Sequence, residues 1–232
     1  MPRTSYRKLS RSVVAAGVAA PMLALSACSS DTTSDIQLPG APEGFALTAP
    51  GSKLDLGEPA YVATQTSKGP DDQEPAIIFW KMTAQGPAEK PLEGSEDVVD
   101  DPSNIDHFVC MMYDIEYLGT GGEVPEFKEI GTPYDDPRTM PIGEGNRMAN
   151  FVGAFAGDGP CEVAEEDKLP DDVEGLEEGK VYKGVDLGFV SKDEGIDPTG
   201  LEFTYAIESV PELDDHTATV SWNKGLPLLG NI

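Results

Sequence analysis

The residues with the most readable chemistry lie near the N-terminus, where a short apolar stretch ends at Leu25-Ser26-Ala27-Cys28. A thiol that closes such a run is typical of a bacterial lipoprotein signal, in which the chain is cut before the cysteine and the cysteine is acylated. The apolar stretch, residues 13–25, is too short to span a bilayer, which needs about 20 residues. Four basic residues precede it: Arg3, Arg7, Lys8 and Arg11. We therefore predict a helical signal peptide over residues 1–27 and a diacylglyceryl cysteine, with palmitate, at Cys28.

This prediction also gives the location of the protein in the cell. Two or three acyl chains on Cys28 would hold the protein firmly at the outer face of the cell membrane, because each buried methylene contributes roughly 0.8 kcal/mol. No later run of the sequence is long and apolar enough to cross a membrane. An ordinary secretory signal, followed by a chance cysteine, is the alternative that the residues leave open.

The two remaining cysteines, Cys110 and Cys161, form an even pair once Cys28 carries lipid. Outside the cytoplasm such a pair usually forms a disulfide. The crosslink would close a loop of about fifty residues and stabilise the fold by roughly 3–4 kcal/mol. We therefore predict a Cys110–Cys161 disulfide.

A copper site is the alternative use of this region, because thiolate and thioether ligands select copper. The candidate ligands are His107, Cys110, Met111 and Met112, with Met140 and Met148 further along the chain. Residues 107–112 read as a strand, in which neighbouring side chains point to opposite faces. His107 and Met111 would face one way, and Cys110 and Met112 the other. Core methionines beside a disulfide are therefore the favoured interpretation, and we predict no metal ligands.

Catalytic patterns are weak throughout the chain. The two histidines, His107 and His216, belong to no nucleophile motif, and no Gly-x-Ser-x-Gly elbow or phosphate-binding glycine pattern occurs. If the two remaining cysteines form a disulfide, the two histidines do not readily supply the ligands of a zinc site. Carboxylates are plentiful, so a glycosidase with two suitably spaced carboxylates stays open. We predict that the protein is not an enzyme and carries no cofactor.

The charge is strongly negative, with 42 acidic against 16 basic residues and a net charge of −26. Removal of the signal leaves 12 basic residues and a formal charge of −30. Such a surface repels nucleic acid and attracts cations and basic partners. Solubility is the simpler explanation of this negative charge, and calcium binding is the more specific one. The acidic runs at 96–101, 165–172 and 193–197 contain no calcium-loop pattern, so a calcium site would need several loops.

Alternating apolar residues and Gly/Pro turns predict an all-β protein of about seven to nine strands, with no amphipathic helix after the signal. Gly86-Pro87 is expected to end one of these strands, and residues 162–178 to hold at most a helical turn. The predicted strands are residues 52–56, 60–64, 76–84, 107–118, 148–155, 179–190, 201–207 and 217–222. An antiparallel β-sandwich of the immunoglobulin-like kind, with long acidic loops, fits this number of strands.

The chain also resembles a known family in three stretches. They are residues 56–60, which read Leu-Gly-Glu-Pro-Ala, residues 108–121, which end in Gly-Thr-Gly, and residues 176–185, which are followed by Phe-Val. These match turns and strand ends of a secreted immunoglobulin-like domain of unknown function found in Gram-positive and actinobacterial lipoproteins, often misnamed after a telomeric repeat-binding factor. Leu118-Gly119 and Ser191 depart from the family pattern. The resemblance covers residues 50–222 and implies a binding or spacer role, with no catalytic residues to carry over.

The predicted organisation is a signal peptide at 1–27, a flexible tether at 28–50, a sandwich at 51–224 and a C-terminal tail at 225–232. We expect a non-catalytic, lipid-anchored envelope protein that presents loops 124–150 and 162–178 to a protein partner. The alternative is a lipoprotein that binds a cation, glycan or lipid. Trp80 and Trp222 are expected in the core, since exposure beside Tyr61 or Tyr134 would instead favour glycan stacking.

Overall fold

The computed structural model describes residues 32–93, 98–99, 101–127, 131–154, 159–213 and 218–223. The chain divides into two units, Met1–Ser30 and Asp31–Ile232, and the described residues all belong to the second. The predicted signal peptide, Cys28, His216 and the tail at 225–232 lie outside the described residues. Within the described ranges, no helix has the length and apolar character needed to cross a membrane.

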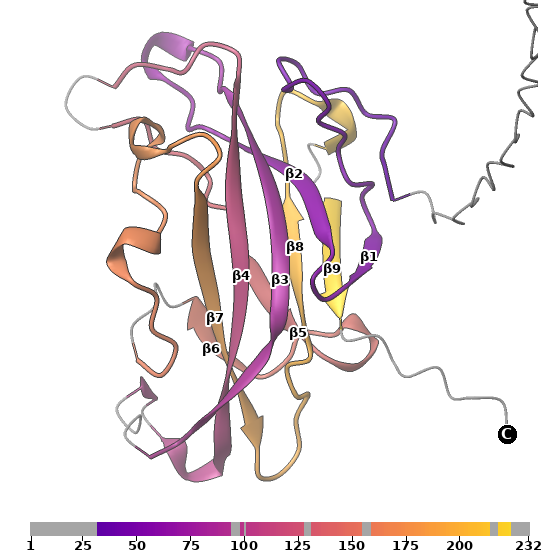
Figure 1. Cartoon of the computed structure of the whole chain (residues 1–232), viewed down its shortest axis with the longest axis vertical. Coiled ribbons are helices and arrows are strands. Elements are labelled where there is room, and N and C mark those ends of the chain that lie inside the picture. The colour runs from indigo at the N-terminus through magenta and orange to yellow at the C-terminus, as the bar shows by residue number, and fades with distance from the viewer. Residues whose placement is uncertain are drawn as a thin grey trace, which may run out of the picture. The chain divides into compact units, whose positions relative to one another are not determined.

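Strands dominate the described ranges and lie in two sheets (Figure 1). One sheet has the order β1-β9-β8-β5 and the other the order β2-β3-β4-β7-β6. The strands are β1 Ser52–Asp55, β2 Pro59–Gln65, β3 Ile77–Pro91, β4 Ile105–Gly121, β5 Thr139–Ile142, β6 Phe151–Ala154, β7 Val181–Ser191, β8 Gly200–Tyr205 and β9 Ala218–Asn223. Short 3-10 turns connect them: η1 Pro70–Asp72, η3 Pro102–Asn104, η4 Glu144–Asn146, η5 Glu165–Asp167, η6 Val173–Gly175 and η7 Pro211–Leu213.

The long hairpin of β3 and β4 forms the centre of the five-stranded sheet, paired from Ile77↔Gly121 to Pro91↔His107. The prediction that Gly86-Pro87 ends β3 is wrong. The register shifts between Ala84 and Pro87, and the strand then continues to Pro91. A bulge of this kind lets a strand pass a proline, which cannot donate to the ladder.

The four-stranded sheet joins the two ends of the domain. β1 pairs with β9 in parallel, from Ser52↔Val220 to Asp55↔Asn223, whereas β8 pairs antiparallel with both β9 and β5. β5 was not predicted, because it is only four residues long and contains Pro141. Its position at the edge of the sheet explains how the proline is tolerated.

The main core fills the space between the two sheets. Strand β4 sends its alternate apolar side chains into it, as predicted: Val109, Met111, Tyr113, Ile115 and Tyr117. Trp80 and Trp222 are both fully buried there. The indole Nε1 of Trp80 donates to Thr64 Oγ1 at 2.8 Å, and that of Trp222 donates to the Glu58 carbonyl at 2.8 Å. The expected core role of both tryptophans is confirmed.

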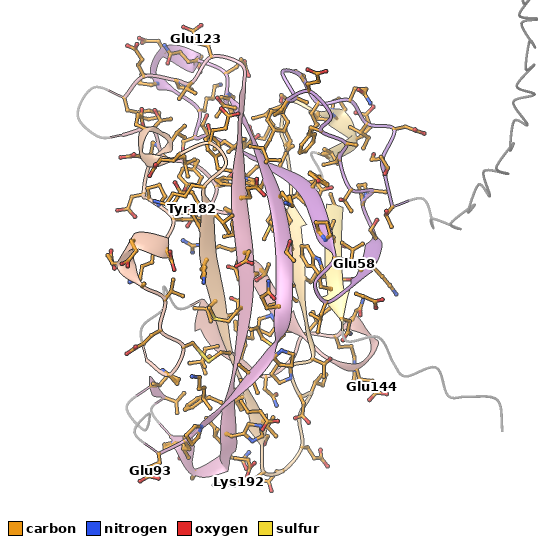
Figure 2. All side chains as sticks on the ribbon, in the orientation of Figure 1. Glu58, Glu93, Glu123, Glu144, Tyr182 and Lys192 are labelled. Atoms are coloured by element: carbon orange, nitrogen blue, oxygen red, sulfur yellow. A yellow bond between two sulfur atoms is a disulfide. The ribbon has the colours of Figure 1, made fainter. Side chains whose placement is uncertain are left out.

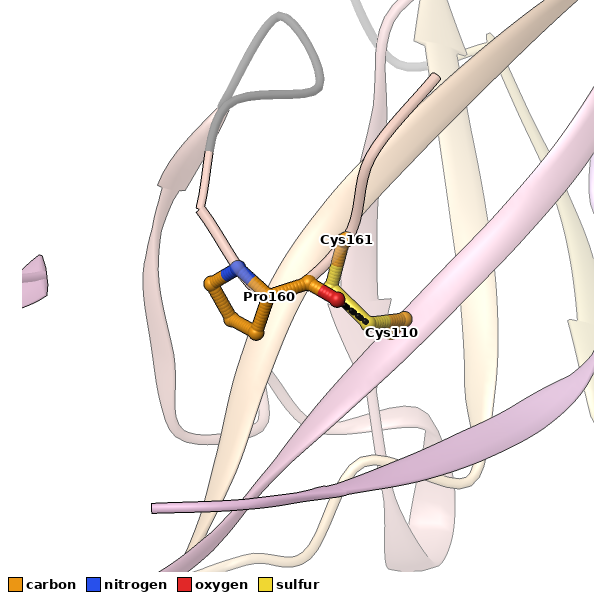
Figure 3. Close-up of a disulfide and its surroundings, with 3 residues drawn as sticks. All are labelled: Cys110, Pro160 and Cys161. Atoms are coloured by element: carbon orange, nitrogen blue, oxygen red, sulfur yellow. Dashed lines mark hydrogen bonds between the residues drawn. A yellow bond between two sulfur atoms is a disulfide. The ribbon is translucent and has the colours of Figure 1, made fainter. Parts of the chain in front are cut away.

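A second, smaller cluster lies on the opposite face of the five-stranded sheet. It consists of Ile105, Phe108, Cys110, Cys161, Val163, Val185 and Leu187. The predicted disulfide is present at its centre, joining residues 51 apart in sequence whose Cα atoms lie 5.6 Å apart. Cys110 Sγ also lies 3.8 Å from the Pro160 carbonyl oxygen (Figure 3). The disulfide therefore fastens the chain after β6 onto the outer face of β4.

The segment expected to form a flexible tether packs on the domain from residue 32 onward. Leu38 and Leu47 are buried in the main core, and Thr48 N donates to the Tyr61 carbonyl at 2.8 Å. Thr33 and Thr48 form an isolated bridge. The expected tether is therefore wrong for residues 32–50, because two apolar side chains within a Pro/Gly-rich sequence suffice to hold it against the sheets.

The predicted all-β sandwich is confirmed, with one parallel pair among its antiparallel strands. The immunoglobulin-like arrangement is not confirmed. Immunoglobulin sandwiches place strands B and C, which follow one another in the chain, in different sheets. Here β2, β3 and β4 are neighbours in one sheet. The apolar alternation establishes that two sheets pack together, but it carries no information about which strand follows which.

Candidate functional site

A pocket of about 620 Å³ opens beside the N-terminal half of β7. Residues from both long loops singled out in the sequence, 124–150 and 162–178, line it together with β4 and β7. Its inner wall contains Tyr113, Ile115, Tyr182 and Gly184; its rim contains Asp136, Arg138, Glu165, Glu166, Lys168, Asp171, Lys180 and Lys183. Figure 2 marks the position of Tyr182 on β7. A pocket of this size is typical of ligand sites.

The outer wall of the pocket is formed by residues 161–175, which we term the strap. The strap begins at Cys161, whose disulfide to Cys110 fixes it to the sheet. Val163 packs into the outer cluster just beyond this crosslink. The 3-10 turn Glu165–Asp167 then comes close to β7. One end of the strap is therefore held by a covalent bond and apolar contacts.

Hydrogen bonds to the loop at 131–134 hold the other end of the strap. The Glu174 carboxylate accepts from Thr132 N at 2.8 Å and from Thr132 Oγ1 at 2.9 Å. Val173 N donates to the Thr132 carbonyl at 3.0 Å, and Tyr134 Oη donates to the Pro170 carbonyl at 2.7 Å. Burial raises the pKa of Tyr134, so its hydroxyl stays a donor at neutral pH. Fixed at both ends, the strap gives the pocket a defined shape.

Basic side chains gather at this pocket although the protein is strongly acidic. Each of the four has an acidic partner within the chain. Lys168 Nζ lies 2.8 Å from Glu165, Lys180 Nζ 3.2 Å from Glu177, and Lys183 Nζ 3.9 Å from Asp167. The Arg138 guanidinium donates to Asp136 through both Nε and Nη2. Each positive charge of the rim is therefore paired with a carboxylate of the same chain.

Two carboxylates of the rim, those of Glu166 and Asp171, have no ion-pair partner among the described residues. Both residues are exposed. Together with the overall charge of −26, they make the mouth of the pocket attractive to a basic ligand.

Asp186 lies close to the pocket but between the two sheets, where it is 2% exposed. Burial raises the pKa of its carboxyl to about 7; the hydrogen bond from Thr139 Oγ1 and the charge of Arg138 oppose this rise. Thr139 belongs to β5, so the contact links the two sheets. Burial, and then the charge of Asp186, also raise the pKa of the neighbouring Tyr113.

The copper candidates are not brought together. Met111 lies in the main core, Cys110 is in the disulfide on the opposite face, and Met112 packs there too. His107 Nδ1 lies 2.8 Å from Asp106. Met148 is exposed elsewhere, next to β5. Among the described residues no three His, Cys, Asp or Glu side chains form a group suited to a metal ion.

Comparisons with known proteins add no relative: no protein-family model, curated protein or solved structure matches this chain. The resemblance to the secreted lipoprotein domain stays a prediction.

Proposed function

We propose that this protein is a non-catalytic, lipid-anchored component of the cell envelope whose β-sandwich binds a partner protein at the pocket beside β7. One observation carries the proposal. The two long loops, 124–150 and 162–178, meet at this pocket, and the second is fastened by a disulfide and by hydrogen bonds at opposite ends. Loops that bind partners are typically positioned in this way by a rigid scaffold.

The location rests on the sequence, through the signal-like segment and Cys28. The disulfide supports it, because structural disulfides persist in oxidising compartments. An outer-surface module tethered by lipid would act as an accessory subunit or adaptor.

A ligand-binding lipoprotein is the second candidate, favoured by the pocket volume of about 620 Å³. A glycan would lack stacking surfaces at Trp80 and Trp222, since both are fully buried. A lipid would need a closed apolar cavity, whereas the rim here is charged and open. A small basic molecule fits the uncompensated carboxylates of Glu166 and Asp171 best.

Affinity capture from detergent-solubilised membranes tests the first proposal. The full chain, the pocket variant Glu166→Lys/Asp171→Lys and a control variant Glu144→Lys/Glu212→Lys would be compared. Both variants change the net charge equally, and the control sites are exposed residues of η4 and η7, which do not line the pocket. A stoichiometric partner kept by the control and lost by the pocket variant is expected. Equal recovery of the partner with the pocket variant and the control variant would contradict binding at the pocket.

A further inference from the structure

Among the described residues, half of β7 has no strand beside it on one side. β4 pairs with β7 along its whole length, from Glu116↔Val181 to Ile105↔Ser191. On the other side, among the described residues, β6 pairs with residues 186–188. Within the described ranges, residues 181–185 therefore form an open edge of the five-stranded sheet, and Lys183, Gly184 and Val185 of this edge line the pocket.

The register shows which backbone groups point into the open side. In an antiparallel pair, successive residues direct their N–H and C=O alternately toward and away from the partner strand. Tyr117 N donates to the Lys180 carbonyl, so Lys180 faces β4. Phe189 N donates to the Asn150 carbonyl on the β6 side, so Phe189 faces away from β4. The register is continuous over residues 181–190, which places the polar backbone groups of Val181, Lys183 and Val185 on the side away from β4. Lys183 and Val185 line the pocket on that side.

The strap does not occupy these groups. Among the described residues, no backbone hydrogen bond joins the strap to Val181, Lys183 or Val185. Edge strands are often shielded by a covering loop or by a lysine. The strap touches the edge through Val163, which shares the outer cluster with Val185, and through Asp167, 3.9 Å from Lys183 Nζ. It is nevertheless held at both ends and borders, together with β4, β7 and residues 136–138, a pocket of about 620 Å³, which we term the slot. Val181, the first residue of β7, is 45% exposed.

We propose that this slot receives an extended segment of the partner protein, which adds to the five-stranded sheet as a strand beside residues 181–185. The inference rests on the proposed function and specifies how the partner is bound. Five residues of strand span about 17 Å, and main-chain hydrogen bonds supply the affinity in this mode of recognition. Because the strap is already fixed, little conformational freedom is lost on binding.

The segment is basic. The four cations of the rim are paired within the chain, whereas the carboxylates of Glu166 and Asp171 are not. The net charge of −26 attracts positive segments from a distance and repels acidic ones. Binding therefore weakens as salt increases, because these carboxylates are exposed to solvent.

Amide hydrogen exchange tests the strand pairing directly. The full chain in detergent would be mixed with a synthetic hexapeptide of alternating valine and lysine, or with a matched peptide of valine and glutamate. The basic peptide should slow exchange at the Val181, Lys183 and Val185 amides at least about tenfold, and the acidic peptide should not. Unchanged exchange at these amides with millimolar basic peptide would overturn the inference, and so would protection confined to other residues.

A proline substitution isolates the backbone contribution. Lys183→Pro removes an N–H that points away from β4 and so spares the existing ladder, and proline is tolerated at strand edges. Lys183→Ala removes the same side chain but keeps the N–H. Peptide affinity should fall at least about tenfold for Lys183→Pro, equivalent to 1.4 kcal/mol, and should stay at or above the wild-type value for Lys183→Ala. Equal affinities for the two variants would refute strand pairing.

The two proposals fail differently. If a captured partner is lost with Glu166→Lys/Asp171→Lys but the β7 amides still exchange freely in its presence, binding at the pocket is supported and strand addition is contradicted. If a captured partner binds equally well whatever the pocket charges, the proposed function itself is contradicted.

Discussion

The two apolar clusters on either face of the five-stranded sheet are built differently. The main core lies between two sheets and contains large, fully buried side chains, including Trp80, Trp222 and Phe203. Within the part of the chain that the structure describes, no second sheet lies above the outer cluster. The strap covers it, with Cys161 and Val163 supplying part of the apolar contact.

This difference shows how one sheet can carry a stable scaffold on one face and a shaped surface on the other. Burial alone stabilises the main core, at roughly 25 cal/mol per Å² of apolar surface. The outer cluster is too small to order an irregular, acidic loop, because fixing each residue costs roughly 1–2 kcal/mol in conformational entropy. The disulfide lowers that cost by constraining the unfolded chain.

The largest effect is expected in the main core, for Trp222→Ala. The change leaves a cavity and an unpaired Glu58 carbonyl, so the free energy of unfolding should fall by about 5 kcal/mol. Denaturant unfolding followed by circular dichroism would measure this loss. Trp222→Phe is the control and should lose about half as much. If the free energy of unfolding of Trp222→Ala fell by less than about 1 kcal/mol, the main core would not be the main source of stability between the two sheets.

Removing the crosslink should affect mainly the outer region. Cys110→Ala/Cys161→Ala opens a loop of 51 residues and should lower the free energy of unfolding by about 4 kcal/mol. In the native state, amides of residues 159–175 should exchange faster, while those of β3 and β8 keep their protection. Uniformly faster exchange would contradict the division into two regions.

Asp186 places a titratable group inside the main core. Its pKa is about 7 in the folded state and about 3.9 in the unfolded chain. Between pH 4 and 7 the folded state therefore holds more protons, so the free energy of unfolding falls as the pH rises through this window, by roughly 3 kcal/mol.

Asp186→Asn should abolish that slope while keeping an acceptor for Thr139 Oγ1. Unfolding would be measured at pH 4, 5.5 and 7. The free energy of unfolding of the variant relative to the wild type should increase at each step. Glu126→Gln, at an exposed residue, is the control and should leave the slope intact. Parallel pH profiles for the Asp186 variant and the wild type would show that the carboxyl is ionised in the folded protein.

The smallest effect is expected where hydrogen bonds hold the far end of the strap. Glu174→Gln weakens the charge-assisted bonds from Thr132 and should cost about 1 kcal/mol of stability. Exchange at residues 170–175 should accelerate without a change at Cys161. Glu178→Gln, also exposed, is the matched control. No difference between these two variants would indicate that the disulfide and the apolar contacts of Val163 and Val173 position the strap without these hydrogen bonds.

The two faces of β4 could be predicted from sequence, because side chains alternate along a strand with a fixed period of two. The alternation assigns Met111 and Cys110 to opposite faces of the sheet, and they lie in separate apolar clusters there. The disulfide followed from the even number of cysteines left after Cys28. Both predictions depend only on local pattern or counting.

The pocket could not be predicted, because it needs Arg138, Asp171 and Lys183 to meet across long separations in sequence. The burial of Asp186 could not be predicted either, for a different reason. It alternates with Val185 and Leu187, so it reads as a solvent-facing residue on a half-buried strand. The sheet is covered on both faces there, and the polar residue is buried against β5. Only the position of the second sheet reveals this.

The parallel pairing of β1 with β9 has a consequence for biogenesis. The first strand has its hydrogen-bonding neighbour at residues 220–223, so the four-stranded sheet cannot close until the chain has been made through β9. Any nascent or truncated form that ends before β9 exposes the edge of β1 and the cavity meant for Trp222. Such forms are the species that quality-control proteases and holding chaperones would meet.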